Sequence, residues 1–98
     1  MNFKIIFSTT AKEQYFELEQ NPSLAKRFKA VRKTLGLMET NIRHPSLNTH
    51  IFDEMLGING EKVFEAYSEN STPQAYRIFW HYGPDKRDIT IIAITPHP

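Results

Sequence analysis

The chain has 98 residues, of which 40% are apolar, 23% charged and 12% aromatic, and its formal net charge is +1. This length suits a single domain covering residues 1–98, and this composition excludes a disordered chain, a collagen-like repeat and a coiled coil. Because there is no cysteine, disulfides, thiolate metal sites and cysteine nucleophiles are excluded too. Apolar runs such as Ile91–Ile94 are too short to span a bilayer, and Lys4 precedes only three apolar residues, so we expect a soluble cytoplasmic domain without a signal peptide or membrane contact.

Residues 2–8 are predicted to form the first strand, because an apolar, β-prone segment there ends at a run of hydroxyl residues. A helix is expected next, since Thr10 stands three residues before Glu13, which is the spacing of a capping box. Apolar residues then recur every three or four positions, at Ala11, Tyr15 and Leu18. This spacing predicts a helix that ends near residue 20 and turns one apolar stripe toward a core.

Asn21 and Pro22 are predicted to open a second helix, with Asn21 as its cap and Pro22 in its first turn. An apolar stripe with spacings of four and three residues runs through this helix: Leu24, Phe28, Val31, Leu35, Met38 and Ile42. Gly36 lies inside it and weakens the prediction that it is continuous. We expect the two helices to pack as an antiparallel hairpin against a sheet.

Residues 43–60 show no clear periodicity and are expected to form an irregular link that lies over the edge of the core. Three strands are predicted after it, at residues 63–69, 75–82 and 88–95, with polar turns at 70–74 and 83–86. Strands joined by such short connections form an antiparallel meander. The predicted order is therefore β-α-α-β-β-β, an α+β fold with a helical hairpin packed on one face of a small, mainly antiparallel sheet.

This order of elements resembles the RelE/ParE toxin superfamily. The motif that carries the resemblance is Tyr76–Trp80 (YRIFW), which is similar to a tyrosine–arginine–apolar strand of that family. Val63–Tyr67 (VFEAY) resembles the strand before it, and Ile89–Ile94 followed by His97 resembles the last strand with its terminal histidine. The stretch Pro45–Leu47 resembles the link after the second helix. The match extends over nearly the whole chain.

The resemblance implies a toxin that pairs with an antitoxin protein. Some members of the superfamily cut mRNA in the ribosomal A site without a metal ion or another cofactor, by attack of the ribose 2′-hydroxyl on the adjacent phosphate. Other members inhibit DNA gyrase and do not cut RNA. The chain is therefore expected to be a ribosome-dependent mRNA endonuclease, with a ParE-like gyrase inhibitor or a catalytically silent, antitoxin-binding relative as the alternative.

Arg77 and His97 are the first two candidate catalytic residues. Arg77 presents a fixed fork of donors that matches phosphate oxygens, so it would stabilise the transition state. The alternative is a surface arginine paired with Glu65 or Glu69 across the hairpin. His97 titrates near neutral pH and would be the general acid, or else it is a tail histidine without a role.

Glu65 and Tyr67 are expected to share the sheet face that bears Arg77. Glu65 would be the general base or a structural partner of Arg77, and Tyr67 would contact RNA by stacking or by donating to phosphate, or else pack against the sheet. His81 lies four residues after Arg77, so it is expected on the same face as a further RNA-binding or acid–base residue.

The basic residues of the second helix provide a second candidate RNA surface. They lie off the apolar stripe: Lys26, Arg27, Lys29, Arg32 and Lys33. Such a surface would bind the phosphate backbone of RNA, or it is the ordinary solvated face of a helix. The histidines at positions 44 and 50 fall in the link, and no histidine pair has the helical spacing of metal ligands, so no metal site is expected. Glu65 and Tyr67 stand where RelE has lysines, which favours the alternative that does not cut RNA.

Overall fold

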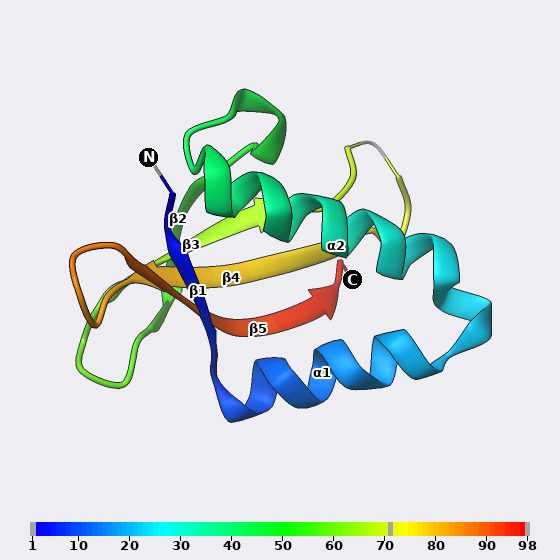
Figure 1. Ribbon diagram of the computed structural model, residues 1–98, viewed down its shortest axis with the longest axis horizontal. Coiled ribbons are helices and arrows are strands. Elements are labelled where there is room, and N and C mark those ends of the chain that lie inside the picture. Colours follow the sequence, from blue (N-terminus) through cyan, green and yellow to red (C-terminus); the bar gives the residue numbers. More distant parts are fainter. Residues whose placement is uncertain (1, 71, 98) are drawn as a thin grey trace.

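A computed structural model describes residues 2–70 and 72–97 of the chain. Two helices, α1 (Thr9–Gln20) and α2 (Ala25–Thr40), cover one face of a five-stranded sheet (Figure 1). The strands are β1 (Lys4–Phe7), β2 (His50–Leu56), β3 (Lys62–Tyr67), β4 (Tyr76–Tyr82) and β5 (Asp88–Pro96). Their order in the sheet is β1-β5-β4-β3-β2, and only β1 pairs in parallel, with β5. The expected α+β fold is thus confirmed, with one strand more than the sequence predicted.

The start of α1 corrects the predicted capping box. Ser8, and not Thr10, is the N-cap, because its backbone is extended and its Oγ accepts a hydrogen bond from the Ala11 N–H at 3.0 Å. The same hydroxyl donates to the Ile92 carbonyl at 3.2 Å, which ties the helix start to β5. The N–H groups of a helix's first turn have no acceptor within the helix, and a serine just before the helix supplies one. Because Ser8 has this role, Thr10 lies inside the helix and does not cap it.

The second helical segment begins as a short 3₁₀ helix, Pro22–Leu24, that Asn21 caps by accepting from the Ser23 N–H. It continues without a break as α2, and Gly36 lies on its exposed side. The predicted stripe faces the sheet, but its first two members, Leu24 and Phe28, are only half-buried. Its later members are buried, namely Val31, Leu35, Met38 and Ile42. No helix among the described residues is long and apolar enough to cross a membrane.

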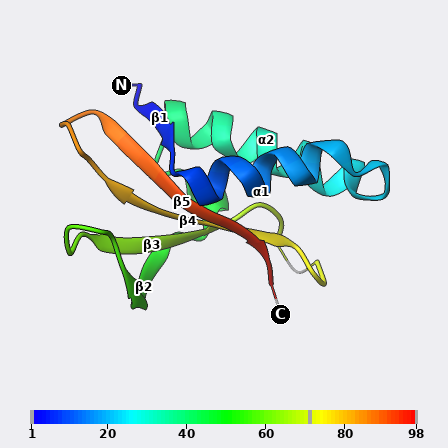
Figure 2. The same ribbon diagram turned by 90° about the horizontal axis from the view of Figure 1, so that it is seen from below.

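The expected irregular link contains a strand that the sequence did not predict. After a 3₁₀ turn at Pro45–Leu47, the chain forms β2 at the edge of the sheet. The strand is mostly exposed, and its register against β3 shifts between Ile51 and Leu56. In Figure 2 the β2–β3 hairpin lies farther from the helices than β5 does, so this part of the sheet bends away from the helix layer. The residues expected in the turn after β3 include Ser71, which lies outside the described residues.

The sheet has one face against the helices and one face that the helices leave open. Ile78 and Trp80 of β4 point into the helix-covered core, together with Ala66 of β3. On β5 the inward set changes phase, because Phe79 pairs with Ala93 while Trp80 pairs with Ile91. Alternation along the strands therefore sends Arg77, and Glu65 on β3, to the open face.

Candidate functional site

A buried carboxylate lies at the centre of the open face. The Glu65 side chain is 3% exposed, and each of its oxygens has a cationic or imidazole partner. Oε2 accepts from Nη1 of Arg77 at 2.7 Å, and Oε1 lies 2.5 Å from Nε2 of His50. The register of β3 and β4 explains the first contact, because Arg77 stands opposite Tyr67, the next residue of β3 on the same face. Glu65 thus joins β2, β3 and β4 by side-chain contacts.

Arg77 keeps unused donors beside this carboxylate. Its side chain is 17% exposed, and its guanidinium lies over the Phe79 ring, 4.9 Å from the centroid. Only Nη1 donates to an acceptor among the described residues, and Nε is buried without a partner there. A buried donor without an acceptor is costly in a folded protein. Nη2 has no acceptor among the described residues and is not buried, so its donors are the ones that an anionic ligand can reach.

His50 is the member of this group that reaches solvent, because 53% of its side chain is exposed. Its Nδ1 lies 3.1 Å from the Asn48 carbonyl oxygen, and its Nε2 faces Glu65. Both ring nitrogens thus face oxygen atoms, and an imidazole can pass a proton between its two nitrogens. The arrangement therefore places a group capable of proton transfer between Glu65 and solvent.

Tyr67 and His97 complete the group on its outer side. The Tyr67 ring lies 5.8 Å from the His50 ring and 6.1 Å from the His97 ring, measured between centroids. Burial raises the pKa of the Tyr67 hydroxyl, and the nearby charge and hydrogen bond of Glu65 raise it further, against the opposing effect of Arg77. His97 is held at the end of β5, where its N–H donates to the Ala75 carbonyl at 2.8 Å. We refer to His50, Glu65, Tyr67, Arg77 and His97 as the open-face cluster.

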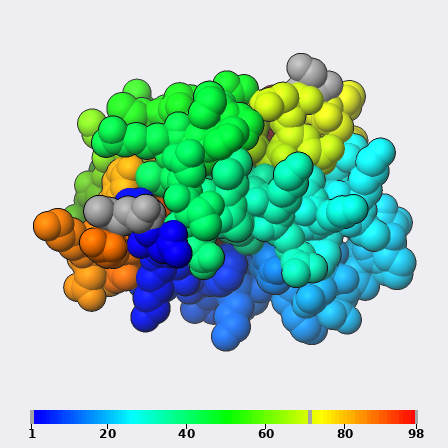
Figure 3. All heavy atoms as spheres, turned by 45° about the horizontal axis from the view of Figure 1, so that its top comes forward, coloured from blue at the N-terminus to red at the C-terminus, as the bar shows by residue number. Residues whose placement is uncertain are grey.

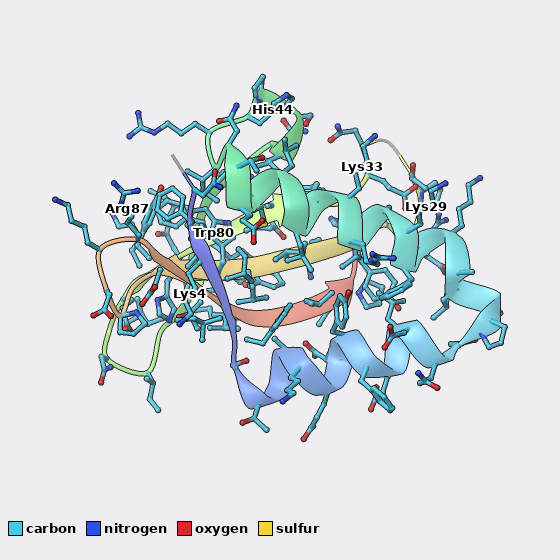
Figure 4. The ribbon with its side chains drawn as sticks, in the orientation of Figure 1. Lys4, Lys29, Lys33, His44, Trp80 and Arg87 are labelled. Atoms are coloured by element: carbon cyan, nitrogen blue, oxygen red, sulfur yellow. The ribbon has the colours of Figure 1, made fainter. Side chains whose placement is uncertain are left out.

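The remaining predicted residues lie elsewhere. His81 is on the open face but at the far end of β4, where its ring is buried and Nδ1 lies 2.8 Å from the Tyr82 carbonyl oxygen. The basic residues of α2 lie on the opposite side of the sheet, where Figure 4 shows Lys29 and Lys33 pointing outward. Arg27 among them is paired with Glu69 at 3.2 Å. The structure therefore does not bring His81 to the open-face cluster, and of the α2 residues Arg27 comes near it, since it lines a hollow together with His97.

His50 is the functional candidate that sequence reasoning missed. The sequence predicts an irregular link here and not β2, so it gives no reason to expect His50 beside Glu65. The available signal was a histidine followed directly by two apolar residues, Ile51 and Phe52. Ile51 pairs with Phe64 of β3 in the sheet. Among the described residues, no group of three or more His, Asp or Glu side chains is arranged to hold a metal ion.

No protein-family model matches the sequence, and no characterised protein has a significantly similar sequence. Solved structures with the same fold are nevertheless found. A YoeB/ParE toxin from Agrobacterium tumefaciens matches with a TM-score of 0.69 and 8% identity over 97% of this chain and 99% of that one. The YoeB dimer from Staphylococcus aureus matches with a TM-score of 0.64 and 18% identity over the full length of both chains. An archaeal RelE–RelB complex from Pyrococcus horikoshii matches with a TM-score of 0.65 and 11% identity over 98% of this chain and 96% of that one. The chain therefore has the fold of the RelE/ParE toxin superfamily.

Proposed function

We propose that this chain is the toxin of a toxin–antitoxin pair, and that it cleaves mRNA on the ribosome without a metal ion. The observation that carries the proposal is the open-face cluster, in which a guanidinium with unused donors lies beside a histidine–carboxylate pair. These groups supply a cation for a phosphorane-like transition state and groups for proton transfer. The shared fold of YoeB and RelE structures supports the toxin class.

The proposed reaction is attack of a ribose 2′-hydroxyl on the adjacent phosphate. A bond from the 2′-oxygen to phosphorus forms while the bond from phosphorus to the 5′-oxygen breaks, which leaves a 2′,3′-cyclic phosphate. Arg77 donates to the phosphate oxygens as their charge develops. His50, with its Nε2–H directed at Glu65, accepts the proton of the 2′-hydroxyl at Nδ1 when the substrate hydroxyl replaces the Asn48 carbonyl there, and His97 protonates the departing 5′-oxygen.

Within the Glu65–His50 pair, His50 is the group that would meet the substrate. The Glu65 oxygens are both engaged and the side chain is 3% exposed, whereas more than half of His50 is open to solvent. The sequence suggested Glu65 as the base, and this geometry supports a revised role in which Glu65 positions the imidazole and balances its charge. Tyr67 lies next to His50, where its ring or hydroxyl would contact the neighbouring nucleotide.

An antitoxin partner belongs to the same proposal. One structure with this fold is a RelE–RelB complex. The chain exposes large apolar side chains that a partner would cover, including Phe16 at 58%, Leu56 at 66% and Ile58 at 96%. Adjacent exposed apolar side chains mark protein-binding surfaces, and Leu56 and Ile58 lie two residues apart at the β2–β3 hairpin. The proposal also places the protein in the cytoplasm, where ribosomes are found.

Gyrase inhibition is the second candidate, and one observation favours it. In the open-face cluster, Arg77 is the only lysine or arginine, and Arg27, which lines a hollow with His97, is paired with Glu69. Phosphate contacts supply much of the affinity of proteins for nucleic acids. A face with one arginine is therefore a sparse surface for binding RNA, whereas it is compatible with binding another protein.

The test is cleavage of mRNA on programmed ribosomes by the wild-type protein and by variants at Arg77. Arg77→Ala is expected to lower the cleavage rate by about 10²–10³-fold, the usual effect of losing one preorganised donor to a transition-state oxyanion. Arg77→Lys retains the charge next to Glu65 and is also expected to be impaired, because a point charge does not replace the fork. Lys12→Gln removes an exposed cation of α1 and is the control, with an unchanged rate expected.

Intact mRNA after incubation with folded wild-type protein would overturn the nuclease proposal. Inhibition of DNA supercoiling by gyrase under the same conditions would then support the second candidate. Circular dichroism of each variant separates a lost reaction from a lost fold.

A further inference from the structure

A pocket of about 550 Å³ lies on the helix side of the sheet, at the β2 edge where α2 ends, and of the open-face cluster only His50 lines it. Its floor is aromatic and consists of Phe64, Trp80 and Tyr82, which face the helix side of β3 and β4. The segment that follows α2 forms its wall. In Figure 3 this green segment and the orange end of β4 lie next to each other on one side of the molecule. A pocket of this volume is large enough for a ligand of the size of one nucleotide.

The aromatic floor presents flat rings to the pocket. Trp80 stacks on Phe64 with a centroid distance of 4.8 Å and an angle of 24°, and Tyr82 meets Trp80 edge-on at 4.9 Å. Trp80 is buried, Phe64 is half-buried, and Tyr82 is 44% exposed. The exposed ring surface therefore belongs to Tyr82 and Phe64, and it is available for stacking by a planar ligand.

The rim of the pocket carries donors and positive charge. His44 Nδ1 accepts from the Ser46 N–H at 3.1 Å, which places the ring hydrogen on Nε2 and makes that atom a donor. Arg43 is exposed and makes no ion pair with any described residue. No described carboxylate lines the pocket, and His50 belongs both to the rim and to the open-face cluster. His44 and Trp80, both of which line the pocket, are labelled in Figure 4, where His44 lies in the segment after α2.

We propose that this pocket binds a nucleotide of the RNA substrate, one that reaches it around the β2 edge of the sheet from the phosphate that is cleaved. The base stacks on Tyr82 and Phe64, and a phosphate accepts hydrogen bonds from Arg43 and from Nε2 of His44. A nucleotide has a flat base, which matches the aromatic floor, and an anionic phosphate, which matches the donors of the rim. Stacking of bases on aromatic side chains does not depend on the base, so no sequence preference is implied. That the nucleotide belongs to an RNA substrate rests on the proposed function. The link between the two is His50, which lines the pocket and contacts Glu65.

Binding is measured with the intact protein and free mononucleotides, so the test does not need the ribosome. Trp80 is the only tryptophan, and its indole N–H gives a single NMR cross-peak in the pocket floor. Titration with uridine or adenosine 5′-monophosphate is expected to shift this peak in a saturable manner. Tyr82→Leu is expected to weaken binding by about tenfold, within the range for loss of one stacked base. Arg43→Gln is expected to weaken it by a similar factor, and Lys12→Gln on α1 is the charge-matched control.

An indole peak that does not move with either nucleotide would overturn the proposal. Equal binding of inorganic phosphate and of nucleotides would refute the stacking, and an equal loss in Arg43→Gln and Lys12→Gln would show unspecific charge attraction. The two proposals fail separately. Nucleotide binding without mRNA cleavage would retain the pocket and remove the nuclease, whereas cleavage without nucleotide binding would do the reverse.

Discussion

Replacing Glu65 by leucine is expected to destabilise the fold strongly, because it leaves the Arg77 guanidinium without its counter-charge. The Glu65 side chain is 3% exposed and that of Arg77 is 17% exposed. Removal of one partner from a buried ion pair costs about 3–5 kcal/mol. Since Arg77 retains some contact with water, which screens its charge, we place the expected loss at the lower end, about 3 kcal/mol.

This loss is large relative to the stability of a small domain. A chain of this length has a free energy of unfolding of about 5–15 kcal/mol, so roughly a fifth or more of it would be lost. The melting temperature is expected to fall by about 12–24 °C. Urea unfolding followed by the fluorescence of Trp80, the only tryptophan, measures the change directly.

Two further variants separate the ion pair from simple loss of packing. The double variant Glu65→Leu with Arg77→Met removes both charges and is expected to recover at least about 1 kcal/mol, because no unpaired charge is then left buried. Glu69→Leu breaks the more exposed pair with Arg27, whose side chains are 25% and 21% exposed, and is expected to cost less than about 1 kcal/mol. A Glu65→Leu protein as stable as Glu69→Leu, or additive effects in the double variant, would refute the reasoning.

Two more predictions concern the backbone and the pH dependence. Gly36→Ala is expected to stabilise the protein by about 0.4–1 kcal/mol in urea unfolding, since Gly36 is an exposed helical position with open space for a Cβ. Gly60→Ala, at a φ of +82°, is expected to destabilise it by about 1–2 kcal/mol, and the opposite order would contradict the assignment. The raised pKa of Tyr67 means that above pH 10 the unfolded chain releases this proton while the folded chain retains it, so stability falls as pH rises. Tyr67→Phe is expected to lose less stability than wild type between pH 9 and pH 11, and parallel pH profiles would exclude the effect.

The helices and four of the five strands were predictable, because the apolar residues of each follow the period of that element. The stripe keeps its spacing along α2 from Val31 to Met38 and is buried there, and Ile42, just beyond the end of the helix, is buried too. The placement of Arg77 and Glu65 on one face followed in the same way from alternation along β3 and β4. These predictions needed only the direction in which each side chain points, which the backbone geometry determines.

Strand β2 was not predictable, because its apolar residues do not follow a regular period. In β2 the apolar residues come as adjacent pairs, Ile51 with Phe52 and Met55 with Leu56, and so fit neither a helix nor an alternating strand. The register shift within the strand is the physical reason, because it changes which residues face β3 along its length. The same kind of irregularity at Ile92 changes the inward phase of β5. Local patterns cannot show pairings that irregular strands make with distant residues.

The open-face cluster also holds the sheet together, and this bears on how its chemistry is to be tested. Glu65 connects His50 on β2 with Arg77 on β4, so a variant that removes its charge weakens the edge of the sheet as well as the reacting group. Loss of activity in Glu65 variants is therefore ambiguous by itself. Arg77→Lys avoids this problem, because an ammonium group next to Glu65 keeps the carboxylate paired while the fork of donors is lost. A folded Arg77→Lys protein without cleavage activity would thus separate phosphate recognition from support of the fold.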